Sequence, residues 1–301
     1  MRIQARWFVA VIVAFALQIT NCRAEIYVFG DSLSETGNFY AATGGTFPPS
    51  PLYFDGRFSN GKAWIEHFAK AVGEPVPTPS ILGGSNFAFN GARAAGLSPY
   101  GTPDLTQQVS SHLLASGGAA DPDDVFVIWA GANDIFFGPS LGESDYLRNA
   151  IEGIRWSIKA LSDAGARNIV VLDLPPLGQT PFFNTIPPVS VQLDAASSAF
   201  NSELANLTCS LRSTLRHVRI ADVKISRLFQ AASRTPRLFG LQNVTDSATL
   251  FDPLTGIGYA ATPGVDANRY LFWDSVHPTA HGHKIIAAFV LIDYKLHCAR
   301  R

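Results

Sequence analysis

Residues 28–38 read VFGDSLSETGN and place Ser32 just after an apolar run that breaks at Gly30. A serine hydroxyl attacks a carbonyl only when a neighbouring base takes its proton and a third group orients that base. Near the other end of the chain, FWDSVHPTAHGH contains Asp274 and His277, three residues apart. This spacing can place both side chains on one side of a turn, as a base and its orienting acid require. It also suits a helix start that is capped by the aspartate.

Two further motifs follow apolar runs and can stabilise the oxyanion that forms when an ester is attacked. Gly-Ala-Asn-Asp at 131–134 follows VFVIWA, so the Asn133 amide can donate a hydrogen bond from the end of a strand. Asn90-Gly91 follows NFAF, where Gly91 can present its backbone N–H without steric hindrance. Each motif also has a simpler explanation, because asparagine shapes turns and glycine supplies a positive φ.

The elements that must position these residues alternate between short apolar runs and longer segments of helical period, which predicts a mainly parallel sheet covered by helices. The candidate strands are 26–29, 86–89, 125–130, 168–172 and 217–221. Helices are predicted around 65–72, 147–161 and 284–296. Two irregular segments, 39–60 and 234–273, are rich in Gly, Pro and aromatic residues. Loops that leave the carboxyl ends of parallel strands are the natural walls of a site.

Taken in order, four blocks of the chain resemble the GDSL or SGNH family of esterases and lipases, over about residues 26 to 295: Gly30-Asp31-Ser32-Leu33, Asn90-Gly91, Gly131-Ala132-Asn133-Asp134 and Asp274-Ser275-Val276-His277-Pro278. The resemblance implies a three-layer α/β/α sandwich, flavodoxin-like, with a mainly parallel five-stranded sheet. It also implies ester hydrolysis by a Ser-His-Asp triad with no cofactor and no metal. Ser32 is then the nucleophile, His277 the base and later the acid, and Asp274 the orienter. The implied oxyanion donors are the N–H groups of Ser32 and Gly91 and the side chain of Asn133.

The length, FDGRFSNGKAW and WDSVHPT are similar to the larger secreted branch of this family, which includes plant GDSL lipases and bacterial phospholipase, lecithinase and hemolysin proteins. A small-molecule or lipid ester is therefore the expected substrate, and a transient lipid or membrane surface is a compatible partner. Acetyl esters of sugars or choline esters are alternatives, as is a catalytically silent binding protein. Six aromatic residues can form an acyl-binding wall or simply pack the loops: Phe39, Tyr40, Tyr53, Phe54, Tyr270 and Phe272.

Residues 1–24 predict a cleaved secretory signal, with arginines before an apolar run from Trp7 to Ile19 and small residues at the end. The run is shorter than the roughly 20 residues needed to span a bilayer, which disfavours a membrane anchor. Residues 25–301 are expected to form one domain, secreted or periplasmic and monomeric. Without its three leader arginines the chain is weakly acidic, which gives no reason to expect nucleic acid as a partner.

Export would permit a disulfide between Cys209 and Cys298, although two buried thiols fit the sequence equally well. Asn206 and Asn243 match the glycosylation pattern, which matters only in a eukaryotic source.

Two rival sites are weaker. Gly-Pro-Ser-Leu-Gly at 138–142 fits a nucleophile elbow around Ser140, with Asp173 and His277 as partners. However, the eight residues GANDIFFG stand between the end of the preceding strand and Pro139, whereas an elbow joins a strand directly to a helix. His277, His281 and His283 with Asp274 offer zinc ligands, but Pro278 favours a helix start that leaves the last two histidines in a first turn.

Overall fold

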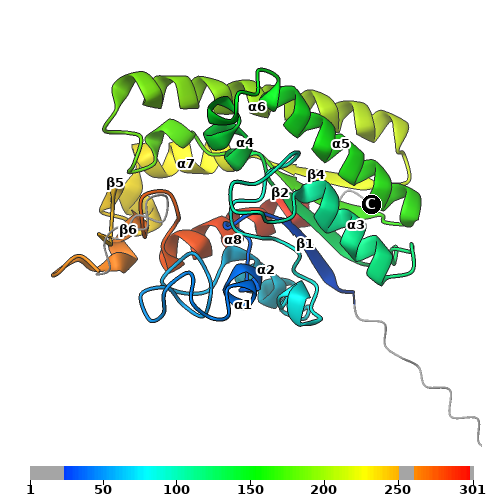
Figure 1. Cartoon of the computed structure of the whole chain (residues 1–301), viewed down its shortest axis with the longest axis horizontal. Coiled ribbons are helices and arrows are strands. Elements are labelled where there is room, and N and C mark those ends of the chain that lie inside the picture. The colour runs from blue at the N-terminus through cyan, green and yellow to red at the C-terminus, as the bar shows by residue number, and fades with distance from the viewer. Residues whose placement is uncertain (1–23, 251–260, 299–301) are drawn as a thin grey trace, which may run out of the picture.

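A computed structural model describes residues 24–250 and 261–298, with side chains described as far as residue 296. The predicted leader, apart from Ala24, lies outside these residues. Four strands form one parallel sheet in the order in which they occur along the chain (Figure 1): β1 (Ile26–Gly30), β2 (Val125–Trp129), β3 (Asn168–Leu172) and β4 (Arg219–Val223). Every residue of β2 and β3 is buried, as expected for parallel strands that are covered on both faces. Apolar runs therefore produced these strands, although β4 begins two residues later than predicted.

The predicted strand at 86–89 is not a regular strand. The segment runs parallel to β1 and exchanges hydrogen bonds with it, from Phe87 N–H to the Val28 carbonyl at 2.7 Å and from Phe89 N–H to the Gly30 carbonyl at 3.1 Å. The Asn38 side chain donates to the carbonyls of Asn86 and Ala88, at 2.7 and 2.8 Å. A side chain thus replaces the neighbouring strand on that edge, and the sheet has four regular strands with an extended fifth segment at its edge.

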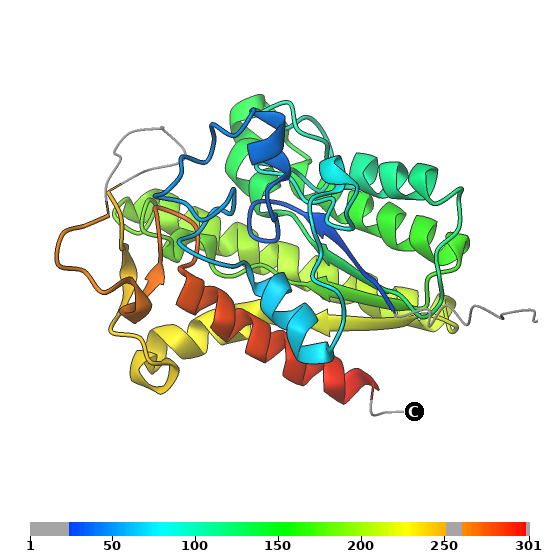
Figure 2. The same cartoon turned by 90° about the horizontal axis from the view of Figure 1, so that it is seen from below.

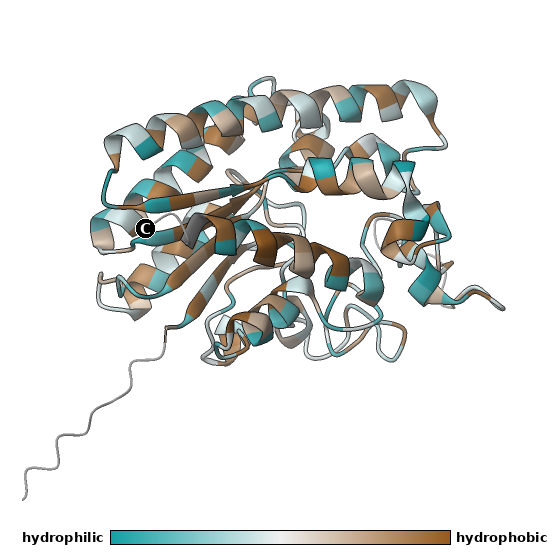
Figure 3. Ribbon diagram, turned by 180° about the vertical axis from the view of Figure 1, so that it is seen from behind, coloured by the Kyte–Doolittle hydropathy of each residue, from teal (hydrophilic) through white to brown (hydrophobic). Residues whose placement is uncertain are grey.

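Helices cover both faces of the sheet and give the three layers that the sequence predicts (Figures 1 and 2). One face carries α2 (Trp64–Val72) and α8 (Ala280–Cys298), which pack on each other. The other carries α3 (Leu105–Ala115), α5 (Tyr146–Ala164) and α6 (Pro187–Thr214). The strands are mostly hydrophobic, whereas α6 alternates hydrophobic and hydrophilic residues along its length (Figure 3). The predicted α/β fold class and the three predicted helices are confirmed.

The two segments predicted to be irregular pack against each other. The later one contains a small second sheet in which β5 (Asn243–Ser247) pairs with β6 (Tyr270–Phe272), so it is not irregular throughout. A separate hydrophobic cluster joins it to the earlier segment through buried Tyr53, Ala248 and Trp273. The remaining short elements are α1 (Asn38–Ala42), α4 (Ala132–Phe137) and α7 (Ile225–Arg234).

Three sequence features concern the surface. Within residues 24–250 and 261–298, no helix combines the length and apolarity that crossing a membrane requires.

Cys209 is an exposed free thiol, and the side chain of Cys298 lies outside the described part. Asn206 is exposed on α6, and Asn243 is half-buried at the start of β5.

Candidate active site

Ser32 stands two residues after the end of β1, where the chain turns sharply at Gly30. The φ angle of Gly30 is +153°, and a Cβ at this position would lie 2.1 Å from the Trp129 carbonyl oxygen on β2. The Gln108 side chain on α3 accepts from the Gly30 N–H at 2.8 Å and donates to its carbonyl at 2.9 Å. Only glycine fits here, and a buried glutamine fixes the strand end that presents Ser32.

Ser32, His277 and Asp274 form a continuous chain of hydrogen bonds. His277 Nε2 lies 2.8 Å from Ser32 Oγ, and His277 Nδ1 lies 2.8 Å from Asp274 Oδ2. The other carboxylate oxygen accepts from the backbone N–H groups of Val276 and His277, at 2.9 and 2.7 Å. The turn therefore orients the carboxylate, the carboxylate orients the imidazole, and the second ring nitrogen faces the serine.

The segment around residues 53–60 holds this turn in place. Tyr53 Oη donates to Asp274 Oδ2 at 2.6 Å, and both residues are fully buried. Ser59 Oγ donates to the Pro278 carbonyl at 2.9 Å, and the Asn60 side chain accepts from the Ala280 N–H at 2.7 Å. These contacts join the FDGRFSNGKAW segment to the WDSVHPT segment, 219 positions further along the chain. Sequence reasoning missed them, because nothing local links Tyr53 to Asp274.

The two motifs predicted to supply oxyanion donors lie side by side. Asn133, at the start of α4, donates one amide hydrogen to the Ala92 carbonyl at 2.9 Å, which leaves its second hydrogen available. Gly91 has φ +67°, and a Cβ there would lie 2.2 Å from the Tyr100 ring. Neither residue is among those that line the pocket described below.

An ion-pair network joins these motifs. The Arg93 side chain is fully buried, with its Nε 3.5 Å from Asp134 and a two-pronged contact to Glu143. Asp134 also accepts from the backbone N–H groups of Ala94 and Ala95, at 2.7 and 3.3 Å. The loop after Gly91 is thereby fixed to the start of α4, which sets the spacing of the two predicted donors.

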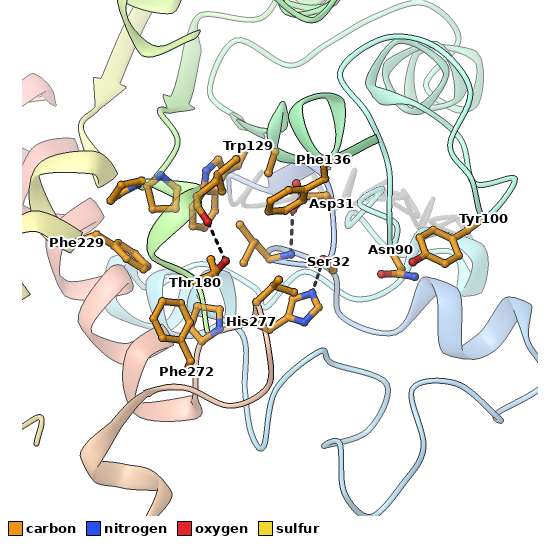
Figure 4. Close-up of a pocket in the computed structure, with 17 residues that line it drawn as sticks. Asp31, Ser32, Asn90, Tyr100, Trp129, Phe136, Thr180, Phe229, Phe272 and His277 are labelled. Atoms are coloured by element: carbon orange, nitrogen blue, oxygen red, sulfur yellow. Dashed lines mark hydrogen bonds between the residues drawn. The ribbon is translucent and has the colours of Figure 1, made fainter. Parts of the chain in front are cut away.

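One pocket opens over Ser32 and His277 (Figure 4). Of the six aromatic residues predicted as a wall, Phe272 lines it. Tyr53 is buried beside Asp274, Phe54 is exposed beneath Arg57, and Tyr270 packs in the small cluster. Phe39 and Tyr40 are half-buried and are not among the lining residues.

The rival nucleophile is not assembled. Ser140 is exposed, and its hydroxyl donates to the Phe137 carbonyl at 2.8 Å. Asp173, its proposed partner, accepts from the N–H and the hydroxyl of Ser226, at 2.8 and 2.7 Å. The imidazole that both triads need faces Ser32.

The histidines proposed as zinc ligands are used elsewhere. His281 Nε2 lies 2.8 Å from the Phe239 carbonyl, and His283 Nδ1 accepts from the Trp64 N–H at 3.2 Å. Burial lowers the pKa of His283 to about 3. In the described ranges, no group of three or more His, Cys, Asp or Glu side chains is placed to hold a metal.

Three acids in or next to the predicted motifs are fully buried. Burial raises the pKa of Asp31 to about 7, that of Glu35 to about 8 and that of Asp134 to about 7. Backbone N–H groups act in the opposite direction at each, as do His277 at Asp31 and Arg93 at Asp134. One oxygen of Glu35 accepts from the Phe39 N–H. Burial thus favours the neutral form of each carboxyl group.

Comparison with known proteins adds a family to this geometry. Residues 26–290 match the GDSL-like lipase/acylhydrolase family. A phosphatidylcholine-sterol acyltransferase of Aeromonas hydrophila is 28% identical over 96% of this chain and 98% of that protein. A GDSL esterase/lipase of Arabidopsis thaliana is 26% identical over 91% of this chain and 92% of its own length. A carbohydrate acetylesterase family member from Sinorhizobium meliloti shares the fold, with a TM-score of 0.51, 15% identity and coverage of 92% and 99% of the two chains.

The buried carboxyl of Glu35 predicts a fall in stability between pH 7 and 9. Its pKa is higher in the folded state than the ordinary value of 4.5, so the folded protein binds more protons than the unfolded chain. The free energy of unfolding therefore decreases as pH rises through about 8. His283 and His112, whose pKa values are lowered, are neutral in both states above pH 7 and do not add to this slope.

Urea unfolding at pH 7, 8 and 9 checks this expectation. Glu35→Gln, which keeps the neutral form, should flatten the slope, although Asp31 and Asp134 leave part of it. Glu203→Gln, on the exposed face of α6, is the matched control and should keep the wild-type slope. An identical slope in Glu35→Gln would show that Glu35 is already ionised at pH 7.

Proposed function

The chain belongs to the GDSL-like lipase/acylhydrolase family and is a hydrolase of ester bonds, and from that premise we propose that it cleaves carboxylic esters through Ser32, His277 and Asp274. The observation that carries the proposal is the hydrogen-bond chain from Ser32 Oγ through the imidazole to the Asp274 carboxylate, with both links at 2.8 Å. A serine, a base and an orienting acid in that order are the parts that acyl transfer needs. The assembled chain supports an enzyme over a silent binding protein.

In the proposed first step, Ser32 Oγ attacks the ester carbonyl while His277 Nε2 takes the hydroxyl proton. Asp274 accepts the Nδ1 hydrogen bond and stabilises the imidazolium. The tetrahedral intermediate places negative charge on the former carbonyl oxygen, toward the N–H groups of Ser32 and Gly91 and the Asn133 amide. Collapse returns the proton from His277 to the leaving alcohol and leaves an acyl group on Ser32. Water then repeats the sequence and releases the acid.

The proposal includes export of the protein, which rests on the leader pattern of residues 1–24. It takes a small-molecule or lipid ester as substrate, with esters of sugars or choline as alternatives. The names of the relatives, which include a thermolabile hemolysin of Vibrio parahaemolyticus, describe those proteins. They support an acyl ester as the class of substrate and do not specify its alcohol.

Replacing Ser32 tests which serine is the nucleophile. We expect Ser32→Ala to abolish hydrolysis of p-nitrophenyl esters, because no other hydroxyl faces His277 among the hydrogen bonds of the described residues. Ser140→Ala is the matched control, since its exposed hydroxyl contacts the carbonyl of Phe137, and it should retain full activity. Initial rates on one ester decide the matter: an active Ser32→Ala protein beside an inactive Ser140→Ala protein would refute the proposal.

Removing the Asn133 side chain tests the oxyanion site. Loss of a side-chain donor of this kind costs on the order of 10² to 10³ in kcat in a serine hydrolase. We expect Asn133→Ala to show such a loss with little change in KM, because the donor acts mainly on charge that develops after binding. Steady-state kinetics and thermal unfolding of the same sample separate chemistry from folding. A well-folded variant with wild-type kcat would exclude Asn133 as a donor.

Tyr53→Phe tests whether the buried tyrosine positions Asp274. The change removes one hydrogen bond to a carboxylate, worth about 1.5 kcal/mol, so kcat should fall by about tenfold. The loss should appear in kcat with KM nearly unchanged, because Tyr53 contacts Asp274 and does not line the pocket.

The matched control for this change is Tyr27→Phe, whose hydroxyl donates to Glu25 at 3.1 Å, outside the pocket lining. It should leave both kcat and KM unchanged. A Tyr53→Phe protein that loses thermal stability but keeps the wild-type kcat would assign Tyr53 a structural role only.

A further inference from the structure

The pocket over Ser32 has two unlike ends (Figure 4). On one side of His277 it is lined by buried, mainly apolar residues: Trp129, Pro175, Leu177, Thr180, Phe229 and Phe272. On the other side lie Asn90 and Tyr100, and Tyr100 is 38% exposed. We call the first end the apolar arm and the second the open end. A substrate held across Ser32 must place one of its halves in each.

The apolar arm ends in protein. Phe229 comes from α7 and Phe272 from β6, and their ring centroids lie 6.3 Å apart. Both rings are almost fully buried, with exposed fractions of 6% and 3%. The hydroxyl of Thr180 donates to the Leu177 carbonyl at 2.8 Å, and the indole N–H of Trp129 donates to the Asp173 carbonyl at 3.1 Å. Both side-chain donors in this arm are thus already used, and its mainly apolar lining favours an apolar chain.

The cavity is small. Its volume is about 50 Å³, whereas a dry apolar cavity of about 150 Å³ holds one benzene molecule of six carbons. Because this volume covers the whole pocket with its open end, the arm accommodates only on the order of two acyl carbons. A longer chain would have to displace the rings of Phe229 and Phe272, and close-packed interiors resist such displacement.

The order of the chemical steps decides which half of the ester occupies the arm. The alcohol leaves first, while the acyl group stays bonded to Ser32, and water must then reach that acyl group. The alcohol needs an exit and the water needs an entrance, both on the alcohol side of Ser32. The exposed Tyr100 marks the open end of the pocket. The closed arm suits the half that remains attached.

We propose that this protein is selective for esters of short-chain acids, whose acyl group lies in the apolar arm. Phe229 and Phe272 set the length limit, and the alcohol departs past Asn90 and Tyr100. This inference rests on the proposed serine mechanism and names the acyl class that the mechanism accepts.

The test compares p-nitrophenyl acetate, butyrate and octanoate, which share one alcohol. In the wild-type enzyme, kcat/KM should fall at least tenfold from butyrate to octanoate, since each methylene that a pocket cannot accept costs about tenfold or more. Phe229→Ala opens the end of the arm and should raise the ratio of octanoate to acetate kcat/KM by at least tenfold. Phe229→Leu, a milder truncation, should raise the same ratio less and serves if the alanine variant does not fold.

The matched control is Phe87→Ala, a half-buried phenylalanine that stacks on Phe29 at 5.6 Å and does not line the pocket. It should keep the wild-type ratio, which separates pocket enlargement from general loosening. Equal kcat/KM for octanoate and butyrate in the wild type would overturn the inference, as would an unchanged ratio in both folded Phe229 variants.

Labelling with a fluorophosphonate probe distinguishes these failures from failure of the serine mechanism. Wild-type protein that is labelled, while Ser32→Ala is not, retains the proposed function whatever chain length it prefers. Wild-type protein that is not labelled and hydrolyses none of the three esters would overturn both proposals.

Discussion

The 2.8 Å contact between Ser32 Oγ and His277 Nε2 joins residues 245 positions apart, and the rest of the structure serves to hold its two ends. At one end, β1 of the parallel sheet ends at Gly30, and the Gln108 side chain holds the N–H and the carbonyl of that glycine. At the other end, a short turn presents His277 before α8 begins. A displacement of about 1 Å at either end would cost on the order of 10² in rate, which explains why both ends are tied to buried elements.

The second constraint is the buried charge of Asp274. Its carboxylate is fully buried, and such a charge is tolerated only when hydrogen bonds replace the water that it has lost. Two backbone N–H groups, the imidazole and the Tyr53 hydroxyl supply those bonds. Asp31 and Glu35 have fewer such donors, and burial raises their pKa values to about 7 and 8.

The features that the sequence predicts are those with a local signature. Apolar runs followed by a glycine predict β1 and β2, because a parallel strand that is buried on both faces consists almost entirely of apolar residues. The same runs locate the residues that follow each strand. The segment at 86–89 shares that signature, yet Asn38 bonds its outer carbonyls and prevents a regular strand. β5, NVTDS, has no apolar run and could not be recognised. The Tyr53–Asp274 hydrogen bond spans 221 positions and leaves no periodicity.

The position of Tyr53 also changes what the long aromatic segments imply about the substrate. Their aromatic residues can form an acyl-binding wall or simply pack the loops, and Tyr53 and Trp273 pack in a cluster beside the turn that carries Asp274 and His277. Side chains that pack there cannot also line the pocket, and Phe272 alone of the six predicted residues does so. Phe272, the last residue of β6, belongs to the later of the two segments, and it closes the arm together with Phe229 on α7. The earlier segment holds a buried carboxylate through Tyr53, so its length is no guide to the size of the substrate.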